Sequence, residues 1–174
     1  PLTELGQDQA HQAGTYFKER GIRFGQLYSS TQEQASDTLE LVSGRTDYTR
    51  LKGIKEWNFG LFEAQPERLQ PKFRPGATSF EDLFVSYGGE GVDQVGERML
   101  VTLTEVMEQA GAEPVLAVSH GGAMWAFYLK IAAQALDPKV RFGNCAICHY
   151  HYEKGYFRLA EVIDPLTGSV YECE

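Results

Sequence analysis

Val115-Leu116-Ala117-Val118-Ser119-His120-Gly121-Gly122 is the stretch that decides the fold of this 174-residue chain. It opens as a short apolar run with β-branched residues at both ends, which predicts a strand buried on both faces, as in a parallel sheet. The run ends in two polar residues, the second of them His120, and two glycines follow. A helical pattern then continues the chain, with one apolar face made by Met124, Phe127, Tyr128 and Ile131.

This strand, its two glycines and the helix predict a phosphate site. Glycines let backbone N–H groups approach an anion, and the N-terminus of a helix adds a favourable dipole. His120 would lie at the carboxyl end of the strand, where open α/β sheets bind their ligands. The same pattern also fits His120 as an ordinary helix N-cap, so both interpretations stay open at this point.

A second junction of the same kind lies earlier in the chain. Residues 26–29 predict a short strand, and Ser30 with Glu33 forms a capping-box pattern at the start of a helix. The apolar stripe of that helix is made by Ala35, Thr38, Leu39 and Val42. Two strand–helix junctions in one sheet could face a common anion.

The loop at residues 54–63 is dense in aromatic side chains and holds two carboxylates, Glu56 and Glu63. Loops with large apolar side chains usually fold back over the body of a domain, and a carboxylate held there can act as a general acid. The simpler interpretation, that both carboxylates are solvated, is also open.

Strands alternate with helices for most of the length, which predicts an α/β fold with a mainly parallel sheet. The chain should close with a hairpin of residues 146–152 and 156–163 around Lys154-Gly155. We find no repeat, low-complexity tract or linker, so residues 1–174 are expected to form a single domain.

Composition and charge exclude several classes of function. The net charge of −8 argues against nucleic acid or an anionic membrane as the main partner. No apolar run reaches membrane-spanning length and no signal peptide is visible, so we expect a cytoplasmic protein.

Three cysteines are too few to suggest a disulfide framework. Cys145 to His149 matches the haem-attachment pattern, but a strand there would point Cys145 and Cys148 to opposite faces. No second ligand pair with zinc spacing follows, so we expect neither haem nor zinc.

Four stretches, taken in order, resemble the histidine phosphatase superfamily, which has the phosphoglycerate mutase-like fold. They are residues 1–10, 28–38, 51–63 and 118–122. Weaker matches are Gly89-Glu90 followed by Arg98, and Asn144. The resemblance implies a three-layer α/β sandwich whose central, mainly parallel sheet carries helices on both faces.

The resemblance also implies a mechanism. A histidine attacks phosphorus and forms a phosphohistidine, which water then hydrolyses, with no cofactor and no metal. His120 would donate to the transferring oxygens and Glu56 would protonate the leaving oxygen. The phosphate would be held by Gly121, Gln34 and Ser30. Imidazole and carboxylate suit these roles near neutral pH.

Two departures from the family pattern matter. The nucleophile of the family lies in an Arg-His-Gly segment upstream of the Pro-Leu-Thr stretch, whereas this chain starts at Pro1. We therefore expect an N-terminally incomplete domain that is inactive as it stands. The family also has an arginine where this sequence has Gln34, which replaces a charge-assisted hydrogen bond and should weaken phosphate binding.

The leading interpretation is a phosphoric monoester hydrolase acting on a small phosphorylated metabolite. A non-catalytic phospholigand-binding domain is the first alternative, favoured by both departures. A mutase is the second, because Arg68, Lys72 and Arg74 could hold a second phosphate. The expected partner is a small-molecule phosphate ester, and a homodimer is compatible with the sequence.

Overall fold

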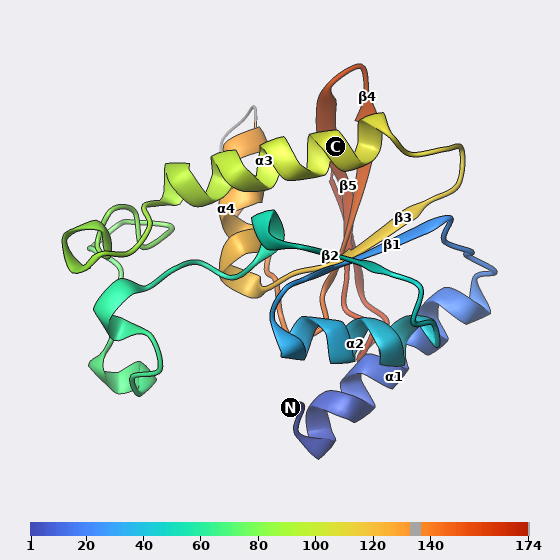
Figure 1. Cartoon of the computed structure of the whole chain (residues 1–174), viewed down its shortest axis with the longest axis horizontal. Coiled ribbons are helices and arrows are strands. Elements are labelled where there is room, and N and C mark those ends of the chain that lie inside the picture. The colour runs from blue at the N-terminus through green and yellow to red at the C-terminus, as the bar shows by residue number, and fades with distance from the viewer. Residues whose placement is uncertain (133–136, 174) are drawn as a thin grey trace.

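The computed structural model describes residues 1–132 and 137–173 (Figure 1). Its α-helices in this part of the chain are α1 (Glu4–Glu19), α2 (Glu33–Ser43), α3 (Val92–Glu108) and α4 (Gly121–Ile131). Its strands are β1 (Gln26–Ser30), β2 (Thr49–Leu51), β3 (Val115–Val118), β4 (Ile147–Glu153), β5 (Tyr156–Ile163) and β6 (Val170–Glu172). None of the described helices combines the length and the apolar character needed to cross a membrane.

The strands form two three-stranded sheets. In the first, β1 lies between β2 and β3 and is parallel to both. In the second, β5 lies between β4 and β6 and is antiparallel to both. The α/β class and a parallel sheet are confirmed, but the strands are only partly parallel, because a strand that returns through a tight turn must pair antiparallel.

That tight turn is the predicted hairpin, which is confirmed. It joins β4 to β5 through Lys154 and Gly155, whose φ angles of 50° and 85° are both positive. Two positive φ angles are what a type I′ turn requires, and this turn matches the twist of the strands on either side.

Helices cover both faces of the parallel sheet, as expected. Figure 1 shows α1 and α2 on one side of β1 and β3, and α3 and α4 on the other. Gly14 brings α1 close to α2, because a Cβ at this position would lie 2.7 Å from the backbone oxygen of Val42.

The strand β3 differs from its prediction in burial. Its residues are half-buried and Ala117 is exposed, whereas burial on both faces was expected. Within the described residues β3 pairs with β1 alone. A strand with one neighbour lacks the shielding that the side chains of a second neighbour would give.

The helix α2 begins later than the capping-box pattern indicated. Ser30 is the last residue of β1, and the N-cap of α2 is Gln32, which makes no side-chain cap hydrogen bond. The Ser30 hydroxyl instead accepts a hydrogen bond from the Gln32 N–H at 3.1 Å. The predicted capping box is therefore wrong, and Ser30 is left at the end of a strand.

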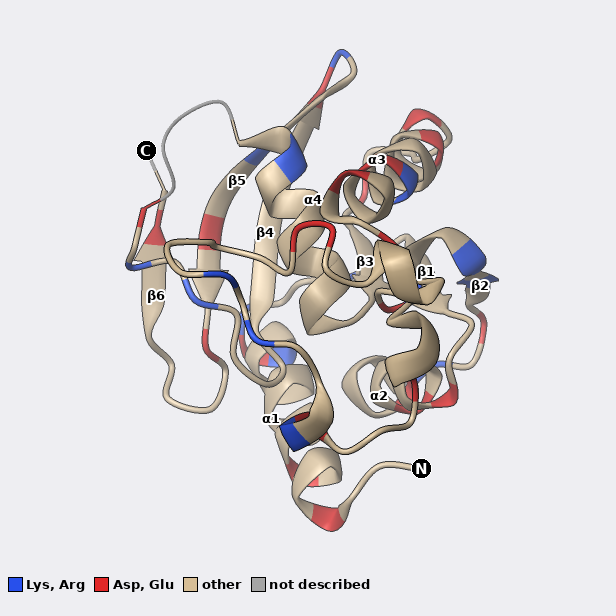
Figure 2. Cartoon of the chain, turned by 90° about the vertical axis from the view of Figure 1, so that its left-hand side faces the viewer, with Lys and Arg blue, Asp and Glu red and all other residues tan. Residues whose placement is uncertain are grey.

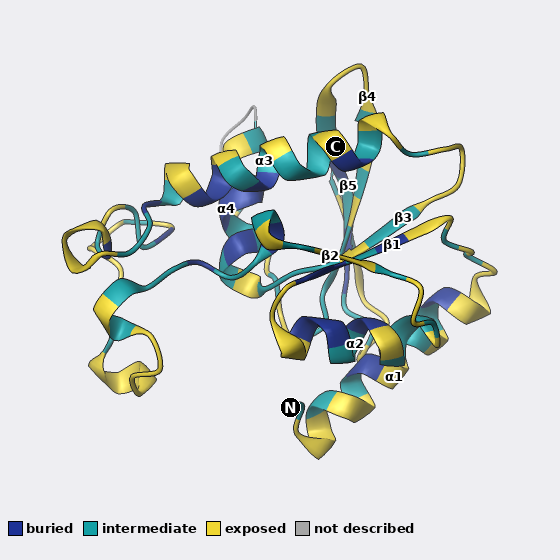
Figure 3. Cartoon of the chain, in the orientation of Figure 1, coloured by how far each residue is buried: buried dark blue, intermediate teal, exposed yellow. Residues whose placement is uncertain are grey.

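A buried core cluster fixes the loop that follows β2 against α3 and α4. Its fully or nearly fully buried members are Ile54, Trp57, Val95, Met99, Ala123, Ala126 and Phe127 (Figure 3). Ile54 and Trp57 come from the loop, and the others come from the two helices. Because these two loop residues are anchored, Glu56 between them is held close to the start of α4.

Candidate active site

The two predicted strand–helix junctions meet. The parallel register pairs Ser29 with Val118, so the carboxyl ends of β1 and β3 lie at one edge of the sheet. There, Nε2 of His120 and the hydroxyl oxygen of the fully buried Ser30 are joined by a hydrogen bond of 2.7 Å. His120 is also the N-cap residue of α4, and its side chain makes no cap hydrogen bond. His120 is thus the N-cap residue of α4 by its position, and its ring also belongs to the site because it contacts Ser30.

Glu56 lies at the N-terminus of α4. One oxygen of its carboxylate accepts hydrogen bonds from the N–H groups of Trp57 and Ala123, each at 2.8 Å. The other oxygen accepts from the N–H of Gly122 at 3.2 Å. The first amides of a helix have no partner within it, so a carboxylate is well placed there.

Gly122 makes this approach of Glu56 possible. A Cβ at position 122 would lie 2.7 Å from the Glu56 oxygen Oε1, closer than two such atoms come. A Cβ at Gly121 would meet nothing within 4 Å. The second of the two glycines therefore admits the carboxylate, and the first leaves open space at the helix N-terminus.

An arginine clamps the loop that carries Glu56. Arg98 on α3 donates two hydrogen bonds to the carboxylate of Glu90, at 2.8 and 3.0 Å. It also donates to the backbone oxygens of Gly53, Lys55 and Glu56, at 2.9, 2.9 and 3.0 Å. The Arg98 and Glu90 side chains are each only 19% exposed.

Glu90 completes the clamp from its other side. Its carboxylate accepts from the Asn58 N–H at 2.9 Å, and its backbone oxygen accepts from the Trp57 indole at 2.7 Å. Burial raises the pKa of Glu90, but its bonds to Arg98 and Asn58 outweigh this and leave the pKa below its ordinary value. The loop is thus held by a charged pair rather than by apolar packing alone.

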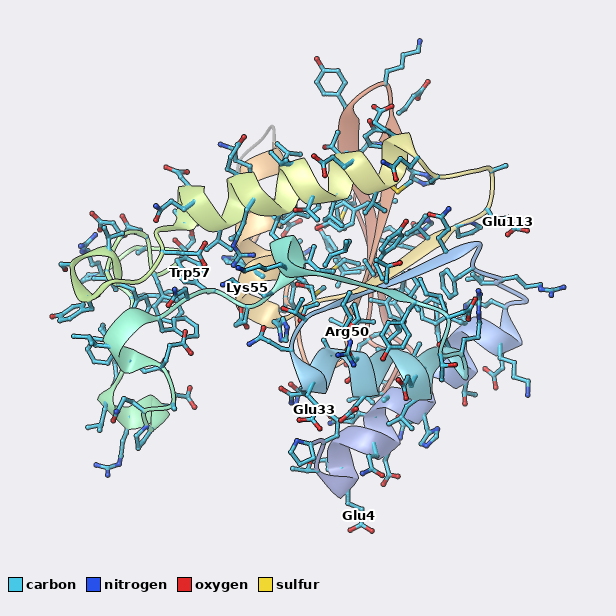
Figure 4. All side chains as sticks on the ribbon, in the orientation of Figure 1. Glu4, Glu33, Arg50, Lys55, Trp57 and Glu113 are labelled. Carbon is cyan, nitrogen blue, oxygen red and sulfur yellow. The ribbon has the colours of Figure 1, made fainter. Side chains whose placement is uncertain are left out.

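Two further bonds tie this loop to the strand ends. The Gln32 side-chain oxygen accepts from the Glu56 N–H at 2.7 Å, and the Ser119 hydroxyl donates to the Ile54 oxygen at 2.7 Å. In Figure 4, the labelled Lys55 and Trp57 mark the residues on either side of Glu56. The loop, both strand ends and the start of α4 form one connected site.

Burial is the main influence on His120. Loss of water around the ring lowers its pKa below the ordinary 6.5; the charge of Glu56 opposes this and that of Arg98 adds to it. The lowered pKa favours the neutral imidazole. A neutral ring can donate one hydrogen bond and accept one, which suits it to bind a phosphoryl oxygen and to move a proton.

This lowered pKa predicts how stability depends on pH. As pH falls below about 6.5, the unfolded chain protonates His120 before the folded chain does, so the free energy of unfolding decreases until the folded pKa is passed. Urea unfolding across this pH range should show a shallower decrease for His120→Gln than for the wild type. The His11→Gln variant, changed on the exposed face of α1, serves as the control. Parallel pH profiles for wild type and His120→Gln would contradict the assignment.

The other predicted residues lie as follows. Glu63 is exposed and accepts from the Phe59 N–H of its own loop at 2.7 Å, so the structure brings Glu56 and not Glu63 to α4. Gln34 is exposed in the first turn of α2, and its neighbour Gln32 makes the contact with the Glu56 loop. Gly121 is exposed as the first residue of α4.

The cysteine segment also differs from its prediction. Cys145 lies before β4, with a φ of 56°, so it does not point from a strand as expected. Cys148 does lie in β4, and burial raises the pKa of its thiol to about 12. The described residues hold no group of three or more His, Cys, Asp or Glu side chains arranged for a metal ion.

Sequence reasoning missed the contribution of Gln32 and the role of Arg98. Gln32 forms a hydrogen bond with a residue 24 positions away, and Arg98 forms them with residues 42 or more positions away. No local sequence pattern indicates such distant pairs. The available signal was weak: Glu90 and Arg98 lie eight residues apart, one before and one inside a helix.

Comparisons with known proteins identify the family of this chain. The family model described as the histidine phosphatase superfamily, branch 1, matches residues 1–165. A probable phosphoglycerate mutase, GpmB, of Yersinia pestis (strain Pestoides F) is 27% identical over 164 residues, covering 88% of this chain and 74% of that protein. The protein of the same name from Yersinia pseudotuberculosis serotype O:1b matches equally.

Solved structures share the fold. Bacillus stearothermophilus YhfR matches with a TM-score of 0.76 at 22% identity, covering 92% of this chain and 83% of that one. A phosphoserine phosphatase of Entamoeba histolytica, solved in complex with 3-phosphoglyceric acid, matches with a TM-score of 0.71, the same identity and the same coverage.

Proposed function

The chain belongs to the histidine phosphatase superfamily, branch 1. From this premise we propose that it functions as a phosphoric monoester hydrolase with a phosphohistidine intermediate. The observation that carries the proposal is the convergence of His120, Ser30 and Glu56 at the N-terminus of α4. A helix N-terminus beside a histidine and a carboxylate provides anion binding together with proton transfer. The substrate is a small phosphate ester.

The residues take the following roles. The phosphoryl group lies at the open N-terminus of α4, near the N–H of Gly121, with His120 and Ser30 donating to its oxygens. Gln34 contributes from the first turn of α2. A histidine nitrogen attacks phosphorus, the bond to the leaving oxygen breaks, and Glu56 gives that oxygen its proton. Water then attacks the phosphohistidine and returns a proton to Glu56.

The nucleophile is a separate histidine. His120 is already hydrogen-bonded to Ser30, and its position suits assistance to the transfer rather than attack. His11, His149 and His151 are all exposed, and His149 contacts Glu161 at 3.1 Å on the second sheet. None of these four histidines is therefore the nucleophile in this proposal.

Two strand edges in the structure could each receive a further strand. Among the described strands, β3 pairs only with β1, and β4 only with β5. Viewed in Figure 2, the labels run in the order β6, β5, β4, β3, β1 and β2, so that β4 and β3 are the inner strands of the row. A strand placed between them would join the two sheets and end beside His120.

The runner-up function is that of a mutase. Arg68 and Lys72 line a second cavity of about 470 Å³, which could take another anionic group. Arg74 pairs with Asp82 at 2.7 Å and is already engaged. We favour hydrolysis, because a mutase must bind a second phosphate and keep water from its phosphoenzyme.

Trapping the intermediate tests the proposal. The protein is mixed with an aryl phosphate, quenched in base and mapped by mass spectrometry. We expect an acid-labile phosphohistidine at a histidine other than His11, His120, His149 and His151, and no turnover by residues 1–174 alone. Phosphate found on His120, or turnover by the 174 residues that His120→Ala abolishes, would overturn the assignment of the nucleophile. Specific binding of vanadate without any turnover would favour the non-catalytic alternative.

A further inference from the structure

A cavity of about 510 Å³ opens directly beside the site. Gly121 and Gly122 at the start of α4 line it, and so does Trp57, the residue that follows Glu56. A phosphoryl group at the N-terminus of α4 would therefore place its leaving alcohol at the mouth of this cavity. A volume of this size is typical of small-molecule sites.

Aromatic rings dominate the walls of the cavity, and they come from four separate parts of the chain. They belong to Trp57, Phe73, Phe80, Trp125 and Phe142. The rings of Phe73 and Phe80 meet edge to face at 4.7 Å, and those of Trp125 and Phe142 at 5.2 Å. Contacts of this kind hold the rings in fixed orientations.

Several polar groups of the walls already have partners within the protein. The Thr78 backbone oxygen accepts from the Trp125 indole at 2.8 Å, and the Ser79 hydroxyl accepts from the Glu81 N–H at 3.0 Å. Arg141 is the one charged residue among the described residues that line the cavity, and it donates to the Val140 oxygen at 2.9 Å. A leaving group rich in hydroxyls or carboxylates would lose water here and gain few partners in return.

We infer that the substrate is a phosphate monoester of an aromatic or bulky apolar alcohol, whose ring lies in this cavity. The inference rests on the proposed function and narrows its substrate class. It also separates this chain from an enzyme built for a small polar acid, for which this cavity offers Arg141 alone as a counter-charge.

Two phosphonates that cannot be hydrolysed test the inference. Benzylphosphonate carries the ring and methylphosphonate lacks it, while the anionic group is the same in both. Calorimetric titration of the full protein should show benzylphosphonate binding about 10- to 100-fold more tightly. The chain has two tryptophans, and both line the cavity, so benzylphosphonate should also change tryptophan fluorescence more than methylphosphonate does.

A cavity variant sharpens the test. Phe73 is 45% exposed, so Phe73→Ala should keep the fold, which circular dichroism would check. It should reduce the ratio of the two affinities about threefold to tenfold, whereas Tyr156→Ala, at the 80% exposed tip of the β4–β5 hairpin, should leave the ratio unchanged.

The outcomes distinguish a failure of the inferred substrate class from a failure of the proposed function. Equal affinity for both phosphonates would overturn the inference and leave the proposed function standing. Failure of both phosphonates and of vanadate to bind would overturn the proposed function and the inference with it.

Discussion

Replacing Glu56 by glutamine should lower the turnover of phosphate esters by about two to four orders of magnitude, the usual contribution of a positioned proton donor. The amide has nearly the same shape as the carboxylate, but it cannot deliver a proton to the leaving oxygen. Its NH₂ group also cannot accept from the Gly122 N–H, which the carboxylate does at 3.2 Å. The measurement is kcat with an aryl phosphate, made on the active protein.

Glu63→Gln is the matched control. Glu63 lies on the same loop but accepts from the Phe59 N–H of that loop instead of from α4, so its replacement should change kcat little. The melting temperatures of both variants would show that the fold is retained. Full activity of Glu56→Gln, or an equal loss in both variants, would remove Glu56 from its role as the acid.

Of the variants described here, Arg98→Met should cause the largest loss of stability, about 3 kcal/mol in the free energy of unfolding. The substitution leaves the largely buried carboxylate of Glu90 without its counter-charge. The expected value lies at the low end of the range for such pairs, since both side chains keep 19% exposure. Three backbone oxygens, those of Gly53, Lys55 and Glu56, would also lose their donor. Turnover should fall as well, because the loop that holds Glu56 loosens.

Arg45→Met provides the comparison. Arg45 binds Asp47 through two similar hydrogen bonds, at 2.8 and 2.6 Å, but the two side chains are 37% and 67% exposed. Exposed pairs contribute little, so this variant should remain much closer to the wild type in urea unfolding. Equal losses for the two variants would show that the Arg98 pair has no special role in holding the loop.

The local parts of the site were predictable from the sequence. The run from Val115 to Gly122 and the strand ending at Ser30 each carry a strand–turn–helix pattern. Parallel pairing then brings Ser30 to His120, because parallel strands end at the same edge. The general prediction that Glu56 lies near this edge followed from the family resemblance and from the aromatic loop around it.

The remainder depends on pairings that local patterns do not contain. The strand β6 is three residues long and mostly exposed, so it has almost no apolar signal, and it forms by pairing with β5. The antiparallel second sheet likewise depends on which strands pair with each other, and the sequence of a single strand does not show its partner. The Arg98 clamp joins residues more than forty positions apart, and it is visible only once α3 lies against the loop.

The contact of Glu56 with α4 couples folding to chemistry. His120 leaves the helix without a side-chain cap, and a carboxylate from 66 residues earlier in the chain supplies one in its place. Any motion that carries Glu56 away therefore uncaps the helix, and fraying of the first turn of α4 releases Glu56. The amide protons of Gly122 and Ala123 should therefore report where Glu56 lies, since they should exchange with solvent faster when its carboxylate has moved away.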